Sequence, residues 1–246
     1  MSSNSSSDCP RSTRLTERIV IHPTALVSPE VRFEGGATVG PYAVLDGRIL
    51  VGAGAHIGAH CLIGGRPKIR SYTAIPEGEV RIGRSTVISE LCAVDSPTGA
   101  ATEIGDECYI MPHCYIGHDS RLEQSVTLTA GCSLGGHVWI GEGATLGLGT
   151  VVHQFSSIGA LAMIGMSATV NRDVPPFAIV RGNPARRVGV NRVGLQRSGL
   201  NAEEIEAIAS AATAWQPNDV WPLERSRHWV VDFASATRRA IIRTGR

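Results

Sequence analysis

An aliphatic residue opens every sixth position of this chain between Ile104 and Val170 without exception. An α-helix would repeat its apolar positions every 3.6 residues, and a half-buried strand would alternate in steps of two. A strict period of six, often with glycine next in line, is instead typical of a stacked parallel β-solenoid. The residues that open these hexads are Ile104, Ile110, Ile116, Leu122, Leu128, Leu134, Ile140, Leu146, Val152, Ile158, Ile164 and Val170.

Three hexads together form one triangular coil of 18 residues, with a short strand on each side and a turn at each corner. Residues that lie 18 apart in the sequence are therefore predicted to be stacked neighbours. The composition suits the narrow interior of a solenoid, because 28 glycines and an aromatic fraction of only 5% go with small and aliphatic inward side chains. The fold class that we expect is β.

The rhythm begins near Ile21 and is interrupted twice, between Gly64 and Glu79 and again between Val94 and Glu103. A solenoid accommodates extra residues where the chain turns outward, so both segments are predicted to be loops at coil corners. Long loops in compact domains are more often functional than not, and we expect these two to build the binding cleft. The alternative is that they only decorate the corners.

The first 18 residues are mostly polar, open with a serine-rich run and contain no apolar stretch. We expect residues 1–18 to form a disordered tail, neither signal peptide nor membrane anchor, and hence a cytoplasmic protein without membrane insertion. The solenoid is expected over residues 19–190. A net charge of +1 provides no basic excess for a nucleic-acid partner.

The repeat gives way to a helical pattern near the C-terminus, and we expect a small helical domain over residues 191–246. Asn201-Ala202-Glu203-Glu204 has the form of a capping box that opens one helix. A second helix is expected from about Leu223 to Ile242, where apolar residues recur at helical spacing. Both helices are expected to cap the open end of the solenoid and protect its exposed strand edge.

Five of the six cysteines fall four residues after a hexad-opening aliphatic residue, in a slot that elsewhere holds alanine or threonine. That position predicts small side chains pointing into the solenoid, and there is no CxxC pair to suggest a zinc or redox site. These cysteines are Cys61, Cys92, Cys108, Cys114 and Cys132.

Histidines gather in one column of the predicted solenoid. Adding 18 to the number of His118 gives Gly136, and adding 18 again gives Gln154. His137 and His153 stand beside them. These residues are therefore expected on one edge of the prism, in three adjacent coils. A single histidine at a corner would carry little information, but three aligned by the repeat are unusual.

The chemistry that suits this column is acyl transfer. An imidazole, with a usual pKa of about 6.5, accepts a hydroxyl proton efficiently near neutral pH, so His118 is the candidate general base. Asp119 follows it directly and is placed to orient it. The N–H of Gly136, one coil away, can approach a thioester carbonyl closely and is the candidate oxyanion donor.

A metal site is the alternative interpretation of these histidines. His113 and His118 have an H-x₄-H spacing that resembles the two-histidine part of γ-class carbonic anhydrases, where a third histidine completes a zinc site between subunits. Counting back two coils from His113 reaches Glu77, inside the first interruption of the repeat. Metal analysis of the purified protein separates the two interpretations.

More specific strings of residues stand in this column and after it. They are Ile116-Gly117-His118-Asp119, Leu134-Gly135-Gly136-His137-Val138, Val152-His153-Gln154-Phe155, Asp173-Val174-Pro175-Pro176, Gly182-Asn183, Gly189-Val190-Asn191 and Gly194-Leu195. Together they resemble the LpxA family of hexapeptide-repeat acyltransferases, the acyl-carrier-protein-dependent UDP-N-acetylglucosamine O-acyltransferases of lipid A synthesis. The resemblance covers roughly residues 19–243.

This resemblance implies a homotrimer of left-handed parallel β-helices with active sites in clefts between subunits. It implies His118 as general base, Asp119 as its support and the Gly136 amide as oxyanion donor. The donor substrate it implies is an acyl group, typically 3-hydroxyacyl, on acyl carrier protein. Phosphopantetheine arrives with that carrier, so no metal and no cofactor of the enzyme's own is expected. The implied substrate contacts are His137, His153, Gln154, Asn191 and Arg197.

Some residues depart from the family pattern on the acceptor side. Tyr115 stands where the family usually has a second histidine, and Ile69-Arg70-Ser71-Tyr72 lacks the carboxylate of the family's sugar-contacting loop. UDP-N-acetylglucosamine or a related nucleotide sugar is the expected acceptor. An amino sugar or a natural-product hydroxyl or amine is the alternative acceptor, and a non-enzymatic scaffold is a third interpretation.

Met166 is the residue from which we predict the length of the acyl chain. It occupies the position that resembles the family's hydrocarbon ruler, where glycine leaves room for longer chains. A bulky residue there predicts a short to medium acyl group. The alternative is that Met166 merely fills a gap.

Overall fold

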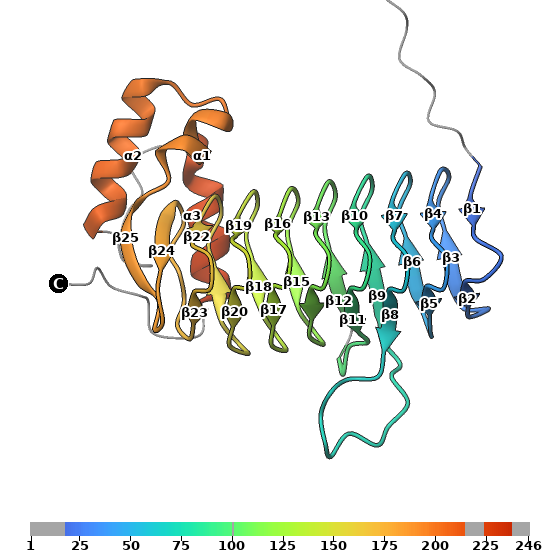
Figure 1. Cartoon of the computed structure of the whole chain (residues 1–246). Coiled ribbons are helices and arrows are strands. Elements are labelled where there is room, and N and C mark those ends of the chain that lie inside the picture. Colours follow the sequence, from blue (N-terminus) through green and yellow to red (C-terminus); the bar gives the residue numbers. More distant parts are fainter. Residues whose placement is uncertain (1–17, 100, 215–223, 238–246) are drawn as a thin grey trace, which may run out of the picture.

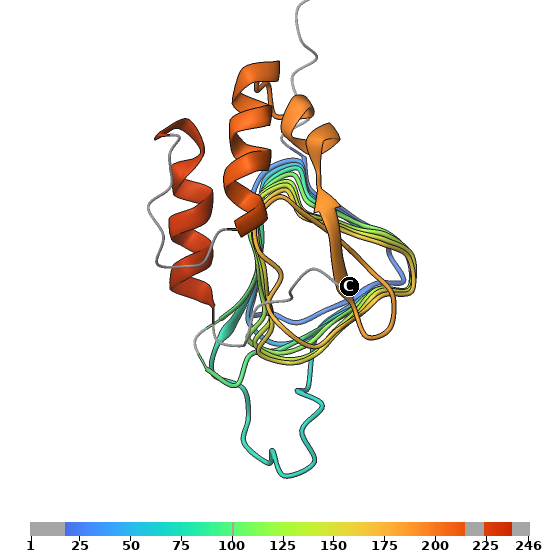
Figure 2. The ribbon, with the colours of Figure 1, turned by 90° about the vertical axis from the view of Figure 1, so that its left-hand side faces the viewer.

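The computed structural model describes residues 18–99, 101–214 and 224–237 of the chain. Short strands stack into a long solenoid, seen from the side in Figure 1, and its outline along the axis is a triangle in Figure 2. Three short helices follow at the C-terminal end. This architecture confirms the predicted β-helix with a small helical region.

Each side of the triangle is one sheet. Sheet A contains β1 Val20–Ile21, β4 Thr38–Val39, β7 His56–Ile57, β10 Val87–Ile88, β13 Tyr109–Ile110, β16 Thr127–Leu128, β19 Thr145–Leu146, β22 Met163–Ile164, β24 Ala178–Arg181 and β25 Arg186–Val190. Sheet B contains β2 Leu26–Val27, β5 Val44–Leu45, β8 Leu62–Gly65, β11 Ala93–Asp95, β14 Tyr115–Ile116, β17 Ser133–Leu134, β20 Val151–Val152 and β23 Thr169–Val170. Sheet C contains β3 Val31–Phe33, β6 Ile49–Val51, β9 Glu79–Ile82, β12 Ala101–Ile104, β15 Arg121–Leu122, β18 Trp139–Ile140 and β21 Ser157–Ile158.

Strand register confirms the coil of 18 residues. Tyr115 pairs with Ser133, which pairs with Val151, and all these neighbours are parallel. Both interruptions of the repeat leave the solenoid at the same corner, because residues 66–78 connect β8 to β9 and the segment after β11 connects to β12. That corner lies between sheets B and C, and we call it the B–C corner.

The hexad-opening residues form the core of the solenoid. Every one of them between Ile104 and Val170 is at most 2% exposed. Burial of a side chain of this size contributes roughly 1.5–3 kcal/mol. These side chains pack into one continuous cluster along the solenoid.

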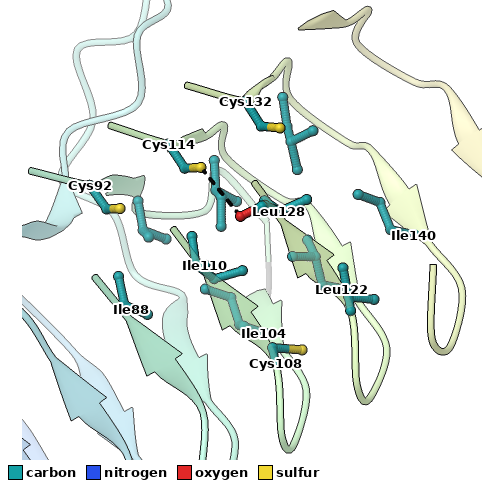
Figure 3. Packing of buried hydrophobic residues seen from close by; sticks show 14 of the residues in the cluster. Ile88, Cys92, Ile104, Cys108, Ile110, Cys114, Leu122, Leu128, Cys132 and Ile140 are labelled. Atoms are coloured by element: carbon teal, nitrogen blue, oxygen red, sulfur yellow. Dashed lines mark hydrogen bonds between the residues drawn. The ribbon is translucent and has the colours of Figure 1, made fainter. Parts of the chain in front are cut away.

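The five predicted inward cysteines are all buried and reduced. Figure 3 shows Cys92, Cys114 and Cys132 beside the aliphatic column. Cys92 Sγ donates to the Met111 carbonyl at 3.1 Å, and Cys114 Sγ donates to the Thr129 carbonyl at 3.2 Å, so each thiol satisfies a turn of the next coil. Burial raises the pKa of the Cys108 thiol to about 11, as expected for an unreactive structural residue.

The helices are α1 Arg192–Arg197, α2 Ala202–Ala214 and α3 Glu224–Ala236. The predicted capping box is present, since Asn201 Oδ1 accepts the N–H of Glu204 at 2.9 Å and Glu204 Oε2 accepts the N–H of Asn201 at 2.8 Å. The short helix α1 was not expected from the sequence. The predicted tail up to residue 17 and the predicted helix beyond residue 237 lie outside the described residues.

The prediction that both helices cap the open end is wrong for α3. Helix α3 runs along the side of the solenoid, where Ser157 Oγ donates to the Ala236 carbonyl at 2.7 Å and Trp229 Nε1 donates to Glu142 at 2.9 Å. In Figure 2 α3, in red, lies beside the triangular outline. Helix α2 packs instead against β25, where Arg187 Nη2 donates to the Ala212 carbonyl at 2.7 Å. β25 is antiparallel to β24 and is the last strand of sheet A.

None of the helices in the described ranges combines the length and the apolar character that crossing a membrane requires.

Candidate active site

The histidine column lies at the B–C corner, as the repeat predicts. His118, Gly136 and Gln154 follow β14, β17 and β20 in three successive coils. The coils are tied at this corner by backbone hydrogen bonds, with His137 N donating to His118 O at 2.9 Å and Phe155 N donating to Gly136 O at 3.0 Å. The structure thus brings the base candidate and the oxyanion candidate together.

His118 and Asp119 form a hydrogen-bonded dyad. His118 Nδ1 lies 2.7 Å from Asp119 Oδ2, and the two side chains are only 11% and 10% exposed. An ionised carboxylate only accepts hydrogen bonds, so Nδ1 is the nitrogen that carries the proton, and in the neutral imidazole the lone pair is on Nε2. This arrangement presents Nε2 as the basic atom.

Asp119 is held in its ionised form by its surroundings. Burial alone would raise the pKa of its carboxyl, but hydrogen bonds from Thr98, His118 and the backbone N–H of Gly99 outweigh that effect and lower the pKa. Thr98 and Gly99 belong to the second interruption of the repeat. Sequence reasoning identified that loop as functional but named neither residue.

Gly136 is in close contact with the His118 ring. A Cβ on Gly136 would lie 2.5 Å from both Cε1 and Nε2 of His118, so only glycine allows the ring its present place. Among the hydrogen bonds of the described residues, none is donated by the Gly136 N–H. A donor that is free and adjacent to the basic nitrogen is what an oxyanion site beside a general base requires.

His137 is held between aromatic neighbours. Its ring stacks on Phe155 at 4.5 Å between centroids and meets the His118 ring edge-on at 5.0 Å. His137 Nε2 also lies 3.7 Å from Asp119 Oδ2. His153 and Gln154 are exposed at the same corner and are free to contact a ligand.

A second polar network lies beside the dyad and joins the two interruptions of the repeat. The Tyr115 hydroxyl donates to Asp95 Oδ2 at 2.6 Å, and Lys68 Nζ lies 3.2 Å from Asp95 Oδ1. The Asp95 side chain is only 1% exposed. Burial and then the Asp95 carboxylate raise the pKa of Tyr115. Tyr115 therefore remains neutral and donates a hydrogen bond from its hydroxyl to Asp95. Neither Lys68 nor Asp95 was identified from the sequence.

Three expected substrate contacts do not reach the column within one chain. Met166 is at the corner between sheets A and B and is 69% exposed. Asn191 caps α1, accepting the N–H of Gly194 at 3.0 Å and donating to the Leu161 carbonyl at 2.7 Å, near the corner between sheets C and A. Arg197 is exposed at the end of α1. The prism separates all three from His118.

The metal interpretation finds little support in the donor geometry. In the described part of the chain, one group of three side chains offers ligand atoms within 4.8 Å of one another, namely His118, Asp119 and His137. The carboxylate oxygens of that group already accept hydrogen bonds from His118, Thr98 and Gly99. These side chains are arranged as a hydrogen-bonded dyad with a neighbour.

The sequence count to the third ligand of the metal interpretation is wrong. Two coils before His113 stands His60, because His113 N donates to Glu90 O and Leu91 N donates to Ala59 O. Glu77 lies instead in the loop between β8 and β9. The count to Glu77 was wrong because the two insertions lengthen their coils. His113 and His118 also flank opposite ends of β14, so they do not converge within one chain.

The chain is similar in sequence to known acyltransferases. A family model described as UDP-N-acetylglucosamine O-acyltransferase, domain 2, matches residues 173–215. The chain is 40% identical over 137 residues to the acyl-[acyl-carrier-protein]–UDP-N-acetylglucosamine O-acyltransferase of Synechocystis, which is 55% of this chain and 50% of that protein. It is 38% identical over 212 residues to the enzyme of the same name from Thiobacillus denitrificans, covering 78% of this chain and 82% of that protein.

The fold has solved counterparts as well. The structure of LpxA from Acinetobacter baumannii matches with a TM-score of 0.78 at 24% identity, covering 91% of this chain and 100% of that one. At that identity the likeness shows the fold alone, whereas the Thiobacillus relative is matched over most of its length. The chain therefore belongs to the family of acyl-[acyl-carrier-protein]–UDP-N-acetylglucosamine O-acyltransferases.

Proposed function

We propose that this protein transfers an acyl group from the thioester of acyl carrier protein to a hydroxyl of UDP-N-acetylglucosamine or a closely related nucleotide sugar. The observation that carries the proposal is the His118–Asp119 dyad packed against Gly136. The relatives of this chain are named for this activity, which supports the same chemistry here.

The reaction follows from the positions of these groups. His118 Nε2 removes the proton of the sugar hydroxyl as the oxygen attacks the thioester carbonyl. The Gly136 N–H stabilises the oxyanion of the tetrahedral intermediate, a contribution typically worth about 10²–10³ in rate. Collapse of the intermediate breaks the carbon–sulfur bond, and His118 returns its proton to the departing phosphopantetheine thiolate. The mechanism needs no metal and no cofactor bound by the protein itself.

A homotrimer with clefts between subunits is part of the proposal. Met166, Asn191 and Arg197 stand on other edges of the prism than His118, so they would complete a site only on a neighbouring copy. In such a cleft, Met166 would limit the acyl chain to short or medium length. Five buried, unpaired cysteines are also what a reducing compartment favours, which supports a cytoplasmic location.

The test is to incubate the protein with short and long 3-hydroxyacyl carrier proteins, with and without UDP-N-acetylglucosamine. Mass spectrometry of the sugar fraction should show an acyl ester that appears only when both substrates are present. Light scattering should give the mass of three chains. No acylated sugar from any donor would overturn the proposed activity, and a monomer that is fully active would overturn the shared cleft.

A further inference from the structure

The loop after β11 closes around the carboxylate of Asp119. Thr98 Oγ1 donates to Oδ2 at 2.7 Å, and the Thr98 N–H donates to Oδ2 at 3.0 Å. The N–H of Gly99 donates to Oδ1 at 2.8 Å. Together with His118 Nδ1, these groups donate hydrogen bonds to both oxygens of the Asp119 carboxylate.

Glycine at position 99 favours this close approach. A Cβ there would lie 3.2 Å from Asp119 Oδ1, which is tighter than an ordinary contact. The backbone of Asp119 is fixed as well, because its N–H donates to Thr102 Oγ1 at 2.9 Å. Hydrogen bonds thus fix both the backbone and the carboxylate of Asp119. The carboxylate is held in the orientation in which it accepts a hydrogen bond from His118 Nδ1.

The loop that supplies these donors is itself anchored. Ser96 Oγ donates to the Gly64 carbonyl at 2.8 Å and Ser96 N donates to the Gly65 carbonyl at 2.7 Å, both on the strand before the first insertion. The extra residues stand at the B–C corner of the coil directly before that of His118. The insertion, anchored through Ser96, therefore places Thr98 beside Asp119.

We propose that Thr98 is a positioning residue for acyl transfer, acting through Asp119. It fixes the carboxylate so that the His118 proton stays on Nδ1 and Nε2 points at the reacting hydroxyl. Thr98 does not touch His118 in any described contact, so its effect on the base must pass through Asp119. The other titratable group facing this carboxylate is His137, whose Nε2 lies 3.7 Å from Oδ2. The inference rests on the proposed function.

Replacing Thr98 by valine removes the hydroxyl donor with little change in shape. We expect Thr98→Val to lower kcat about 10-fold, because a small displacement of a catalytic group is costly. KM for both substrates should stay within about twofold, since Thr98 orients the base and binds neither substrate. Thr98→Ser keeps the donor and should restore most of kcat. Thr127→Val, on the outer face of sheet A, is the matched control and should retain wild-type kcat.

A double-mutant cycle separates positioning from a general loop defect. If Thr98 acts through Asp119, then Thr98→Val should change kcat less than about twofold in an Asp119→Ala background. An equal 10-fold loss in both backgrounds would overturn the inference, as would wild-type kcat in Thr98→Val. Should the valine variant fail to fold, Thr98→Ala against Thr98→Ser makes the same comparison of hydroxyl lost with hydroxyl kept.

Failure of the inference is distinguishable from failure of the proposed function. A wild-type protein that makes no acylated sugar contradicts the function. An active wild-type protein whose Asp119→Ala variant is impaired, but whose Thr98→Val variant is not, contradicts the role of Thr98 alone.

Discussion

Adding a single methyl group at Gly136 should disable the base without unfolding the protein. The new Cβ of Gly136→Ala would stand 2.5 Å from Cε1 and Nε2 of His118, where an ordinary contact is 3.4–4 Å. The His118 ring must therefore move by about 1 Å, and a displacement of that size can cost about 100-fold in rate. That corresponds to about 2.7 kcal/mol of transition-state stabilisation.

The fold should tolerate this substitution. Gly136 does not have the left-handed φ that would strain an alanine, so the free energy of unfolding should change by no more than about 1 kcal/mol. The assay is single-turnover acyl transfer to UDP-N-acetylglucosamine, with thermal unfolding followed by circular dichroism. The matched control is Gly189→Ala, whose Cβ would meet nothing within 4 Å. Wild-type turnover by a folded Gly136→Ala variant would refute the placement of base and oxyanion site.

Further predictions concern the acyl group, the core and pH. Met166→Gly should shift donor preference towards longer acyl chains in competition assays, and an unchanged preference would contradict the ruler assignment. Leu128→Ala, in the fully buried column, should lower the free energy of unfolding by about 2–5 kcal/mol in urea titrations. Because the folded state raises the pKa of Tyr115, its contribution to stability is complete below the usual tyrosine value near 10 and is lost as pH rises beyond it. Tyr115→Phe should therefore flatten the fall in stability between pH 9 and about pH 11, and an unchanged fall would contradict that assignment.

The period of six was sufficient to predict the coils, the inward cysteines and the alignment of His118, Gly136 and Gln154. All of these depend on one regularity, that side chains repeat every 18 residues along parallel strands. From such a pattern, the position of a residue in one coil predicts which residues lie beside it in the next coil.

The residues that sequence reasoning missed lie where the repeat is interrupted. Lys68, Asp95 and Thr98 are contributed by or beside the two insertions, whose paths the period does not determine. The same insertions explain the failed count from His113 to Glu77. The placement of α3 was wrong for a related reason, because an apolar face shows that a helix packs but not against which part of the solenoid.

Asn191 shows how a local signal was available but unused. An asparagine three residues before the N–H that it accepts is the ordinary pattern of a helix cap, and it does cap α1. The resemblance alone suggested a substrate contact. In the proposed homotrimer, Asn191, Arg197 and Met166 would face a ligand bound to a neighbouring copy of the chain.

The central claim is that His118 is the general base, and its most direct test is the single-turnover rate of His118→Ala with acyl carrier protein and UDP-N-acetylglucosamine. Removing a general base typically costs about 10²–10⁴ in rate. We expect a loss in that range with an unchanged circular dichroism spectrum and melting temperature. A folded His118→Ala variant that forms the acylated sugar at the wild-type rate would contradict the account.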